Sequence, residues 1–342
     1  MIMASKNLIP VILFSILLLL PSCSKEEPPN GPPVADFTVK ELVDEIVLTD
    51  NSTDPEGDSL RLSWSVSSPG FTLSGTNQRE VFFNIPLLDN PTDITVELKV
   101  SDLLHETVIQ KDITIPVLTD IRLMGLGITE QSKKSNEAGY EWYIDQANTG
   151  AHSGVNCGPA SVTMAIKWAN SLFTGTAEDA RNMYRPGGGW WYTSDIINYL
   201  NHHEVNNYVV SLGSINKIKE ELDNGNVVIL CLDMHYIRNE SKIKWHIDRF
   251  YNAQNPGWGH FIVVKGYRVV DNNLHFEVYD PYGYGKTYTT GQPKGKNRYY
   301  RSEDIDYSTG IWWDYAIVVS RTSGKGDDAL DPATIPHKWG GR

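Results

Sequence analysis

The stretch SGVNCGPASVTMAIKWA, residues 153–169, places Cys157 where a helix is expected to begin. The apolar positions after it repeat at helical spacing, and Pro159 suits the first turn of a helix, where its missing N–H leaves no partner unsatisfied. Free backbone N–H groups and the helix dipole stabilise negative charge at such an end. They would lower the pKa of a cysteine there and favour the thiolate, its nucleophilic form. The sequence therefore predicts Cys157 as a nucleophile.

A nucleophile of this kind needs a base and a group that orients the base. In NPGWGHFIVVKGY, His260 begins an apolar strand after a glycine-rich approach, so we expect its side chain at the edge of a cleft. In HFEVYDPYGYG, Asp280 ends the next strand directly before Pro281, where a carboxylate can accept from the imidazole of the preceding strand. These residues predict acyl transfer, in which a thiolate attacks an amide carbonyl and the histidine protonates the leaving amine.

The negative oxygen formed in that reaction needs hydrogen-bond donors. Free N–H groups at the start of the helix can supply some of them. Gln146, in WYIDQANTG upstream of the cysteine, is the candidate side-chain donor. Other residues between Gln146 and Cys157 remain alternatives for this part: Asn148, His152 and Asn156.

Four segments in this order resemble the papain-like cysteine peptidases of the bacteriocin double-glycine leader-peptidase group and its stand-alone relatives: YIDQANTGAHSGVNCGPASVTMAIKWA, IKEELDNGNVVILCLD, GHFIVVKGY and VYDPYG. The resemblance spans roughly residues 140–320, the size of one domain. It implies an α+β papain-like domain without a cofactor, a peptide or protein substrate, and a thioester formed on Cys157. By the family's pattern, His260 is similar to the base, Asp280 to the orienting residue and Gln146 to the oxyanion donor. Because no transporter segments follow, we do not expect a role in processing exported leaders.

Plainer interpretations of the same residues stay open. Cys157 could pair with Cys231 in a disulfide, His260 could be a satisfied core histidine, and Asp280 could be a turn residue. A cell-wall amidase, endopeptidase or transpeptidase would use the same three residues, whereas a surface binding protein would use none of them. The nearby tryptophans are interpreted either as walls of a substrate cleft or as core: Trp190, Trp191 and Trp258.

The elements expected around these residues define the larger domain. Helical patterns at residues 159–169 and in TAEDARNMY, TSDIINYLNHH and SINKIKEELDNG come first. Four strands follow, NVVILCLDM, GHFIVVKGYRV, LHFEVYD and WDYAIVVS, and their nearly continuous apolar runs predict a sheet covered on both faces. Helices before a sheet indicate the α+β class. We predict a papain-like α+β domain at residues 140–321 and a flexible tail at 322–342.

A different pattern, of period two, precedes this domain. Leu60, Leu62, Trp64 and Val66 alternate with polar residues, and turn-rich pieces such as DNSTDPEGD separate several such runs. This predicts an all-β sandwich at residues 34–117. The string PPVADFTV…LTDNSTDPEGDSLRLSW…DITVELKVSD resembles PKD or related immunoglobulin-like modules of bacterial surface proteins. Residues 118–139 are predicted to be a linker.

The N-terminus has the features of an export signal. Lys6 precedes the short apolar run LIPVILFSILLLLP, and LLPSC resembles the lipobox of bacterial lipoproteins, in which Cys23 becomes the lipidated first residue. We expect a signal peptide at residues 1–22, a Pro-rich tether at 23–33 and a membrane anchor on Cys23, which places the chain in the cell envelope at the outer membrane. A plain secretory signal is the alternative. The net charge of -12 argues against a nucleic-acid partner.

Overall fold

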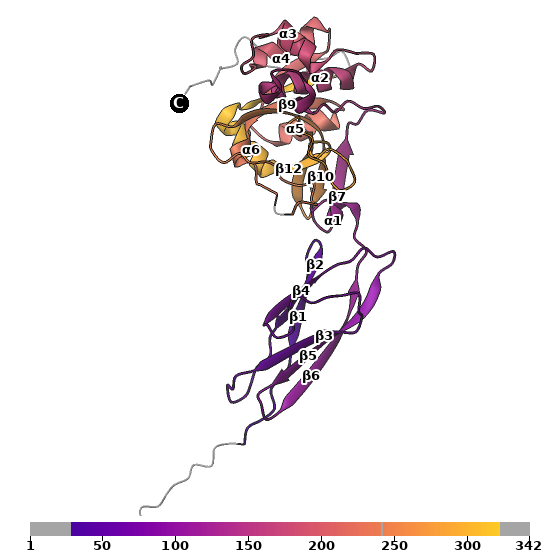
Figure 1. Ribbon diagram of the computed structural model, residues 1–342, viewed down its shortest axis with the longest axis vertical. Coiled ribbons are helices and arrows are strands. Elements are labelled where there is room, and N and C mark those ends of the chain that lie inside the picture. Colours follow the sequence, from indigo (N-terminus) through magenta and orange to yellow (C-terminus); the bar gives the residue numbers. More distant parts are fainter. Residues whose placement is uncertain (1–28, 241, 322–342) are drawn as a thin grey trace, which may run out of the picture.

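The computed structural model describes residues 29–240 and 242–321, and its N-terminal part is an all-β sandwich (Figure 1). Two antiparallel three-stranded sheets form it, in the orders β1-β2-β4 and β3-β5-β6. The strands are β1 (Phe37–Glu41), β2 (Glu45–Asp50), β3 (Arg61–Val66), β4 (Glu80–Asn84), β5 (Thr92–Ser101) and β6 (Glu106–Ile115). Phe37 of one sheet meets Trp64 of the other edge to face, with ring centroids 5.2 Å apart, in a core that both sheets supply. This shared core is the physical origin of the period-two pattern.

The C-terminal part is built on one antiparallel sheet. Within the described residues it has seven strands, in the order β12-β11-β10-β9-β13-β8, with β7 paired to β10. The strands are β7 (Glu130–Ser135), β8 (Asn207–Ser211), β9 (Val227–Asp233), β10 (Gly259–Val270), β11 (Asn273–Tyr279), β12 (Arg298–Arg301) and β13 (Tyr315–Val319). The long strand β10 pairs first with β9 and then with β7 along one edge, and with β11 along the other. This places the start of β10 beside the end of β11.

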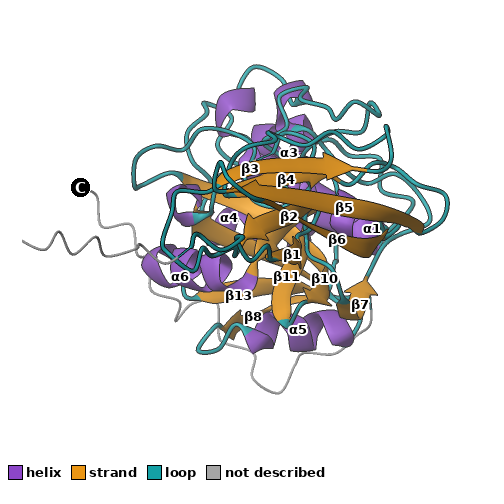
Figure 2. Cartoon of the chain, turned by 90° about the horizontal axis from the view of Figure 1, so that it is seen from below, coloured by secondary structure: helices purple, strands orange, loops and turns teal. Residues whose placement is uncertain are grey.

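Helices cover both faces of this sheet, as the apolar runs predict (Figures 1 and 2). The α-helices are α1 (Asp120–Leu123), α2 (Cys157–Ala169), α3 (Ala177–Met183), α4 (Thr193–His202), α5 (Asn216–Asp223) and α6 (Ser302–Trp312), and the short 3-10 helices are η1 (Gln146–Asn148), η2 (Ser153–Val155) and η3 (Met234–Tyr236). Val162 of α2 and Ile196 of α4 share one buried cluster with Val263 of β10. Ile218 of α5 shares another with the next strand residue, Val264. Because successive strand residues point to opposite faces of the sheet, they pack into the two cores on either side of it.

The prediction of a linker over residues 118–139 is wrong where α1 and β7 occur. β7 extends the sheet, with Ser135 opposite Gly266, and Arg268 of β10 donates to the carboxylates of Asp120 (2.9 Å) and Glu130 (2.8 Å). The sequence pattern misses β7 because an edge strand, mostly exposed here, has no apolar alternation to reveal it. The prediction that the helices all precede the strands is also wrong, because β7 precedes α2 and β8 lies between α4 and α5.

The sandwich contacts the C-terminal domain through the turn between β1 and β2. Arg122 of α1 is 3% exposed and donates to the carbonyls of Leu42 (2.9 Å) and Val43 (2.8 Å). On the same turn, the carboxylate of Asp44 pairs with Lys242 and Lys244, each at 2.8 Å. Two half-buried residues of this turn and the guanidinium of Arg122 thus join the two domains in one contact.

Three predicted features fall on residues that the structure does not describe. The signal segment, the lipidation candidate Cys23 and the tail at residues 322–342 lie outside the described residues, as does most of the tether. Across residues 29–240 and 242–321, none of the helices combines the length and the apolar character that a membrane span needs.

Candidate active site

Cys157 is the first residue of α2, where the sequence places it, and is 4% exposed. Its sulfur accepts hydrogen bonds from the backbone of Gly158 and of Phe261. Position 158 has no room for a side chain, because an added Cβ would lie 2.8 Å from the Cβ of Trp191. Ser161, one turn along α2, donates its hydroxyl to the carbonyl of Phe261 (3.1 Å). This bond fixes the start of the helix beside β10.

His260 and Asp280 meet at the sheet edge where β10 begins and β11 ends. The imidazole Nε2 lies 2.8 Å from Oδ1 of Asp280, and both residues are at most 2% exposed. The antiparallel register, with Val263 opposite Tyr279, is the reason that residues 20 apart in the chain become neighbours. The imidazole is also hydrogen-bonded to the thiol of Cys157. The structure therefore brings together all three residues that the sequence singles out for acyl transfer.

Three further residues hold the carboxylate of Asp280. The hydroxyls of Tyr251 (2.9 Å) and Tyr300 donate to Oδ2, and the backbone N–H of Tyr282 donates to Oδ1 (2.9 Å). Tyr251 comes from the loop before β10 and Tyr300 from β12. Sequence reasoning misses both tyrosines, because nothing in their local pattern distinguishes them from core aromatics. Together with His260 they satisfy a carboxylate that is completely buried.

The surroundings favour a thiolate and an imidazolium. Burial opposes ionisation of Cys157, but the hydrogen bond and positive charge of His260, together with the backbone donors, bring the pKa of the thiol below its usual value. Burial also opposes protonation of His260, but the charge and hydrogen bond of Asp280 and the contact with Cys157 raise its pKa to about 10. For Asp280, burial is outweighed by His260 and the donors around it, so its pKa is lowered. These shifts favour the pair of thiolate and imidazolium, in which the sulfur is nucleophilic.

We expect Cys157 to react with iodoacetamide at pH 6 at least about ten times faster than a free thiol, since the hydrogen bond and positive charge of His260 lower its pKa and favour the thiolate. In His260→Ala, burial acts without the imidazolium, so the alkylation rate should rise only above a pH of about 8.5. The measurement is the alkylation rate from pH 4 to 9, followed by mass spectrometry. Cys157→Ala reports on Cys231, whose pKa is raised by burial and which should stay unlabelled at pH 6. A wild-type rate equal to that of a free thiol would contradict the ion pair.

Gln146 links the two loops that carry the site. It begins η1 and is 1% exposed. Its backbone N–H donates to the carbonyl of Pro281 (2.8 Å), next to Asp280. Its Nε2 donates to the carbonyl of Ser153 (2.9 Å), four residues before Cys157. Gln146 is thus held against the loop that leads to Cys157, and it keeps a second amide hydrogen on Nε2.

The loop around Gln146 is fixed by the residue before it. Asp145 caps η1 by accepting from the N–H of Ala147 (3.0 Å), and it also accepts from the N–H groups of Tyr284 (3.0 Å) and Gly285 (2.9 Å). A Cβ at position 283 would lie 2.4 Å from the same carboxylate, so glycine permits this close approach. Asp145 therefore joins the loop after β11 to the loop before α2.

The other proposed oxyanion donors lie in different surroundings. Nδ2 of Asn156 donates to the carbonyl (2.9 Å) and the hydroxyl (3.0 Å) of Thr149, and its Oδ1 accepts from Arg181 (2.7 Å). The side-chain amide of Asn156 therefore stabilises the loop itself. His152 packs against Gly188, since a Cβ added at Gly188 would lie 2.8 Å from Nδ1 of His152. Asn148 borders a separate surface hollow.

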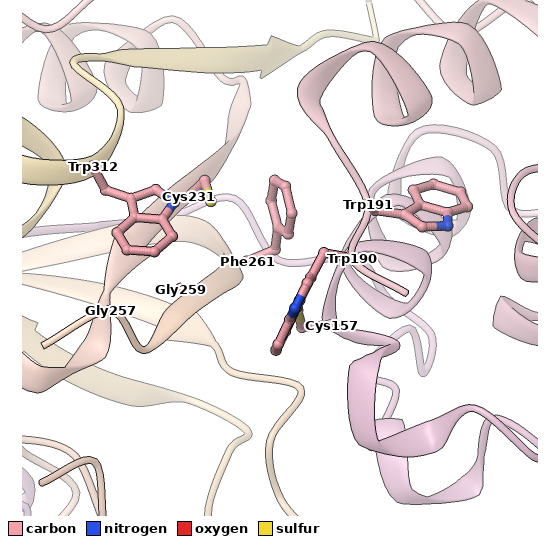
Figure 3. A pocket seen from close by; sticks show the side chains of 8 residues that line it. All are labelled: Cys157, Trp190, Trp191, Cys231, Gly257, Gly259, Phe261 and Trp312. Carbon is pink, nitrogen blue, oxygen red and sulfur yellow. The ribbon is translucent and has the colours of Figure 1, made fainter. Parts of the chain in front are cut away.

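Both described cysteines are free thiols, so the disulfide between Cys157 and Cys231 is ruled out as an interpretation. They line one pocket of about 90 Å³ instead, and Figure 3 shows the ring of Trp190 beside Cys157 and that of Trp312 beside Cys231.

The three candidate tryptophans divide between the two proposed roles, core residue and wall of a cleft. Trp191 is core at 2% exposed, whereas Trp190 is 48% exposed on the pocket rim. Trp258 packs near His260, with ring centroids 5.7 Å apart.

Residues 142–306 match the model of the Peptidase_C39 like family. The match contains Gln146, Cys157, His260 and Asp280, and it points to a peptidase. Comparison with the curated proteins finds no match for the chain.

Solved structures resemble each part of the chain at low sequence identity. A structure assigned as a C39-like peptidase from Bacillus anthracis is 12% identical and covers 57% of this chain and 100% of its own, with a TM-score of 0.37. The PKD1 domain of Vibrio anguillarum Epp is 19% identical and covers 26% of this chain and 98% of its own, with a TM-score of 0.21. The PKD1 domain of the Vibrio cholerae metalloprotease PrtV is 17% identical and covers 25% and 99%, with a TM-score of 0.21. The function is therefore inferred from the family match and the site geometry.

Proposed function

We propose that this protein is an exported cysteine hydrolase of papain-like fold that cleaves peptide bonds through a thioester on Cys157. The observation that carries the proposal is the continuous hydrogen-bonded series of Cys157, His260 and Asp280 inside a segment that matches a peptidase family. The base is close to the nucleophile, and a third group orients the base, which is the arrangement that nucleophilic catalysis requires.

Acylation begins when the Cys157 thiolate bonds to the carbonyl carbon and the carbonyl electron pair moves to oxygen. Backbone N–H groups at the start of α2 and the second Nε2 hydrogen of Gln146 stabilise this oxyanion, each donor supplying about 3 kcal/mol. The imidazolium of His260 then protonates the nitrogen as the C–N bond breaks. The products of this step are the amine, a thioester and a neutral imidazole.

Deacylation returns the site to its starting state. The neutral imidazole of His260 takes a proton from water while the water oxygen attacks the thioester carbon. The C–S bond breaks, the carboxylic acid half leaves, and sulfur departs as the thiolate beside a new imidazolium. Asp280 stays ionised throughout, because its lowered pKa reflects hydrogen bonds from His260 and Tyr300 that favour the carboxylate. Its role is to hold the imidazole in one orientation.

The N-terminal region fits a lipid-anchored enzyme of the cell envelope. In this proposal, residues 1–22 are removed, Cys23 carries the lipid, and the Pro-rich tether and the immunoglobulin-like sandwich hold the hydrolase away from the outer membrane. Labelling of the protein with palmitate in its host, lost in Cys23→Ala, is the expected result. Labelling that persists in that variant would refute the anchor.

The full-length protein incubated with casein, with a mixed peptide library and with purified peptidoglycan tests the proposal, with new termini identified by mass spectrometry. We expect peptide-bond cleavage by the wild type and none by Cys157→Ala. Cleavage of peptidoglycan alone would reassign the enzyme as a cell-wall amidase or endopeptidase. Absence of cleavage and of any acyl adduct on Cys157 would leave a binding protein instead.

A further inference from the structure

Arg181 of α3 is a buried cation that holds the segment leading to Cys157. It is 1% exposed. Its guanidinium donates to Oδ1 of Asn156 (2.7 Å), to the carbonyl of Val155 (2.9 Å) and to the carbonyl of Arg185 (3.3 Å). All three acceptors are uncharged groups. These bonds fix the two residues before the nucleophile to α3.

The positive charge of Arg181 is not cancelled by a carboxylate in contact with it. Within the described residues Arg181 forms no ion pair, and the carboxylate of Asp195, whose charge acts on it, is bonded to Arg185 instead (2.6 Å). Burial lowers the pKa of Arg181, and the negative charge of Cys157 is the largest effect that opposes this. Because a guanidinium keeps its proton in proteins, a thiolate at Cys157 gains a second cation besides His260.

Asn156 occupies the N-cap position of α2, but its side chain does not cap the helix. An asparagine at this position ordinarily accepts from the N–H of the second or third helical residue. In α2 these residues are Gly158 and Pro159, and proline has no N–H. The N–H of Gly158 is therefore the donor that a cap would take, and it is a donor to the sulfur of Cys157. By binding Oδ1 of Asn156, Arg181 leaves this N–H to the sulfur.

We propose that Arg181 is a positioning residue for the nucleophile, which keeps the side chain of Asn156 off the first turn of α2 and adds a buried positive charge that favours the Cys157 thiolate. The consequence for catalysis rests on the proposed function, because hydrolysis needs that thiolate. The ionisation of Cys157 can be measured by alkylation, without a substrate. The titratable and charged groups that act on the sulfur are His260 from β10, Cys231 from β9 and Arg181 from α3.

The rate at which iodoacetamide alkylates Cys157 in the full-length protein, measured from pH 3 to 9, tests the proposal. Arg181→Met loses the charge and the donors, so the midpoint of thiolate formation should rise by at least about one pH unit, which is a tenfold smaller thiolate fraction below the midpoint. Arg181→Lys keeps the charge and should show less than about half of this shift. An unchanged midpoint in folded Arg181→Met would overturn the proposal, since a merely structural role changes stability and not the midpoint.

A measurement on the wild type decides the question where Arg181→Met does not fold. The ¹⁵Nε resonance of Arg181 should shift as the thiolate forms, with the midpoint that alkylation gives, because the new negative charge acts on the guanidinium. Cys157→Ser should remove this step. An Arg181 resonance that stays constant through the midpoint would overturn the proposal. The expected shifts together with no cleavage of any peptide by the wild type would overturn the proposed function alone.

Arg122→Met is the matched control. Arg122 is also buried, at 3% exposed, and donates to two backbone carbonyls, but it lies in the contact between the sandwich and the C-terminal domain. We expect this variant to lower the thermal transition temperature and to leave the midpoint of Cys157 alkylation unchanged. A midpoint that rises as much as in Arg181→Met would show that loss of any buried arginine has this effect, and would refute the assignment to Arg181.

Discussion

Cys157→Ala is expected to lower kcat/KM for a peptide substrate by about four orders of magnitude or more, because it removes the atom that forms the acyl-enzyme. His260→Ala should cost nearly as much, since a buried thiol without the imidazolium loses the main group that lowers its pKa. Steady-state kinetics of both variants on one peptide measure these losses.

The double variant distinguishes a joint mechanism from two separate contributions. Residues that act as one unit give strongly non-additive losses, so Cys157→Ala combined with His260→Ala should be no slower than Cys157→Ala alone. Circular dichroism should show that both single variants remain folded. Activity of Cys157→Ala within tenfold of the wild type would remove Cys157 from the mechanism.

Arg298→Ala should cause the largest loss of stability among single substitutions of charged residues that we consider. Arg298 is fully buried and donates to the carbonyls of Trp245 (2.7 Å) and Ile247 (2.6 Å), to the carbonyl of Asp248 and to the hydroxyl of Tyr288. Its removal leaves these acceptors without a donor inside the protein. The expected cost is about 3–5 kcal/mol of the free energy of unfolding.

Differential scanning calorimetry measures this effect as a fall in the transition temperature of the C-terminal domain of about 10 °C. Lys133→Ala is the control in the same domain, since that lysine side chain is 60% exposed and its carboxylate partner Glu130 lies 3.2 Å away. Such an exposed pair contributes no more than about 1 kcal/mol. Equal shifts in the two variants would show that the buried network around Arg298 contributes little.

The sequence by itself determines that the reactive residues lie at the ends of their helix and strands. Pro159 and the apolar repeat predict the helix start at Cys157, and the glycine-rich approach to one strand and the proline after the next place His260 and Asp280 at strand ends. These are short-range signals, because caps, breakers and periodicity act over a few residues. The same kind of signal predicts the sandwich strands from their alternation.

The tertiary structure alone decides which distant groups complete the site. Tyr251 and Tyr300 reach Asp280 from separate segments, the pocket forms between α2 and the sheet, and β7 adds to the sheet from residues predicted to be a linker. None of these contacts leaves a local pattern. They depend on the packing of elements far apart in the chain, and a polar edge strand or a tyrosine hydroxyl has the same local sequence whether or not a partner lies across the fold.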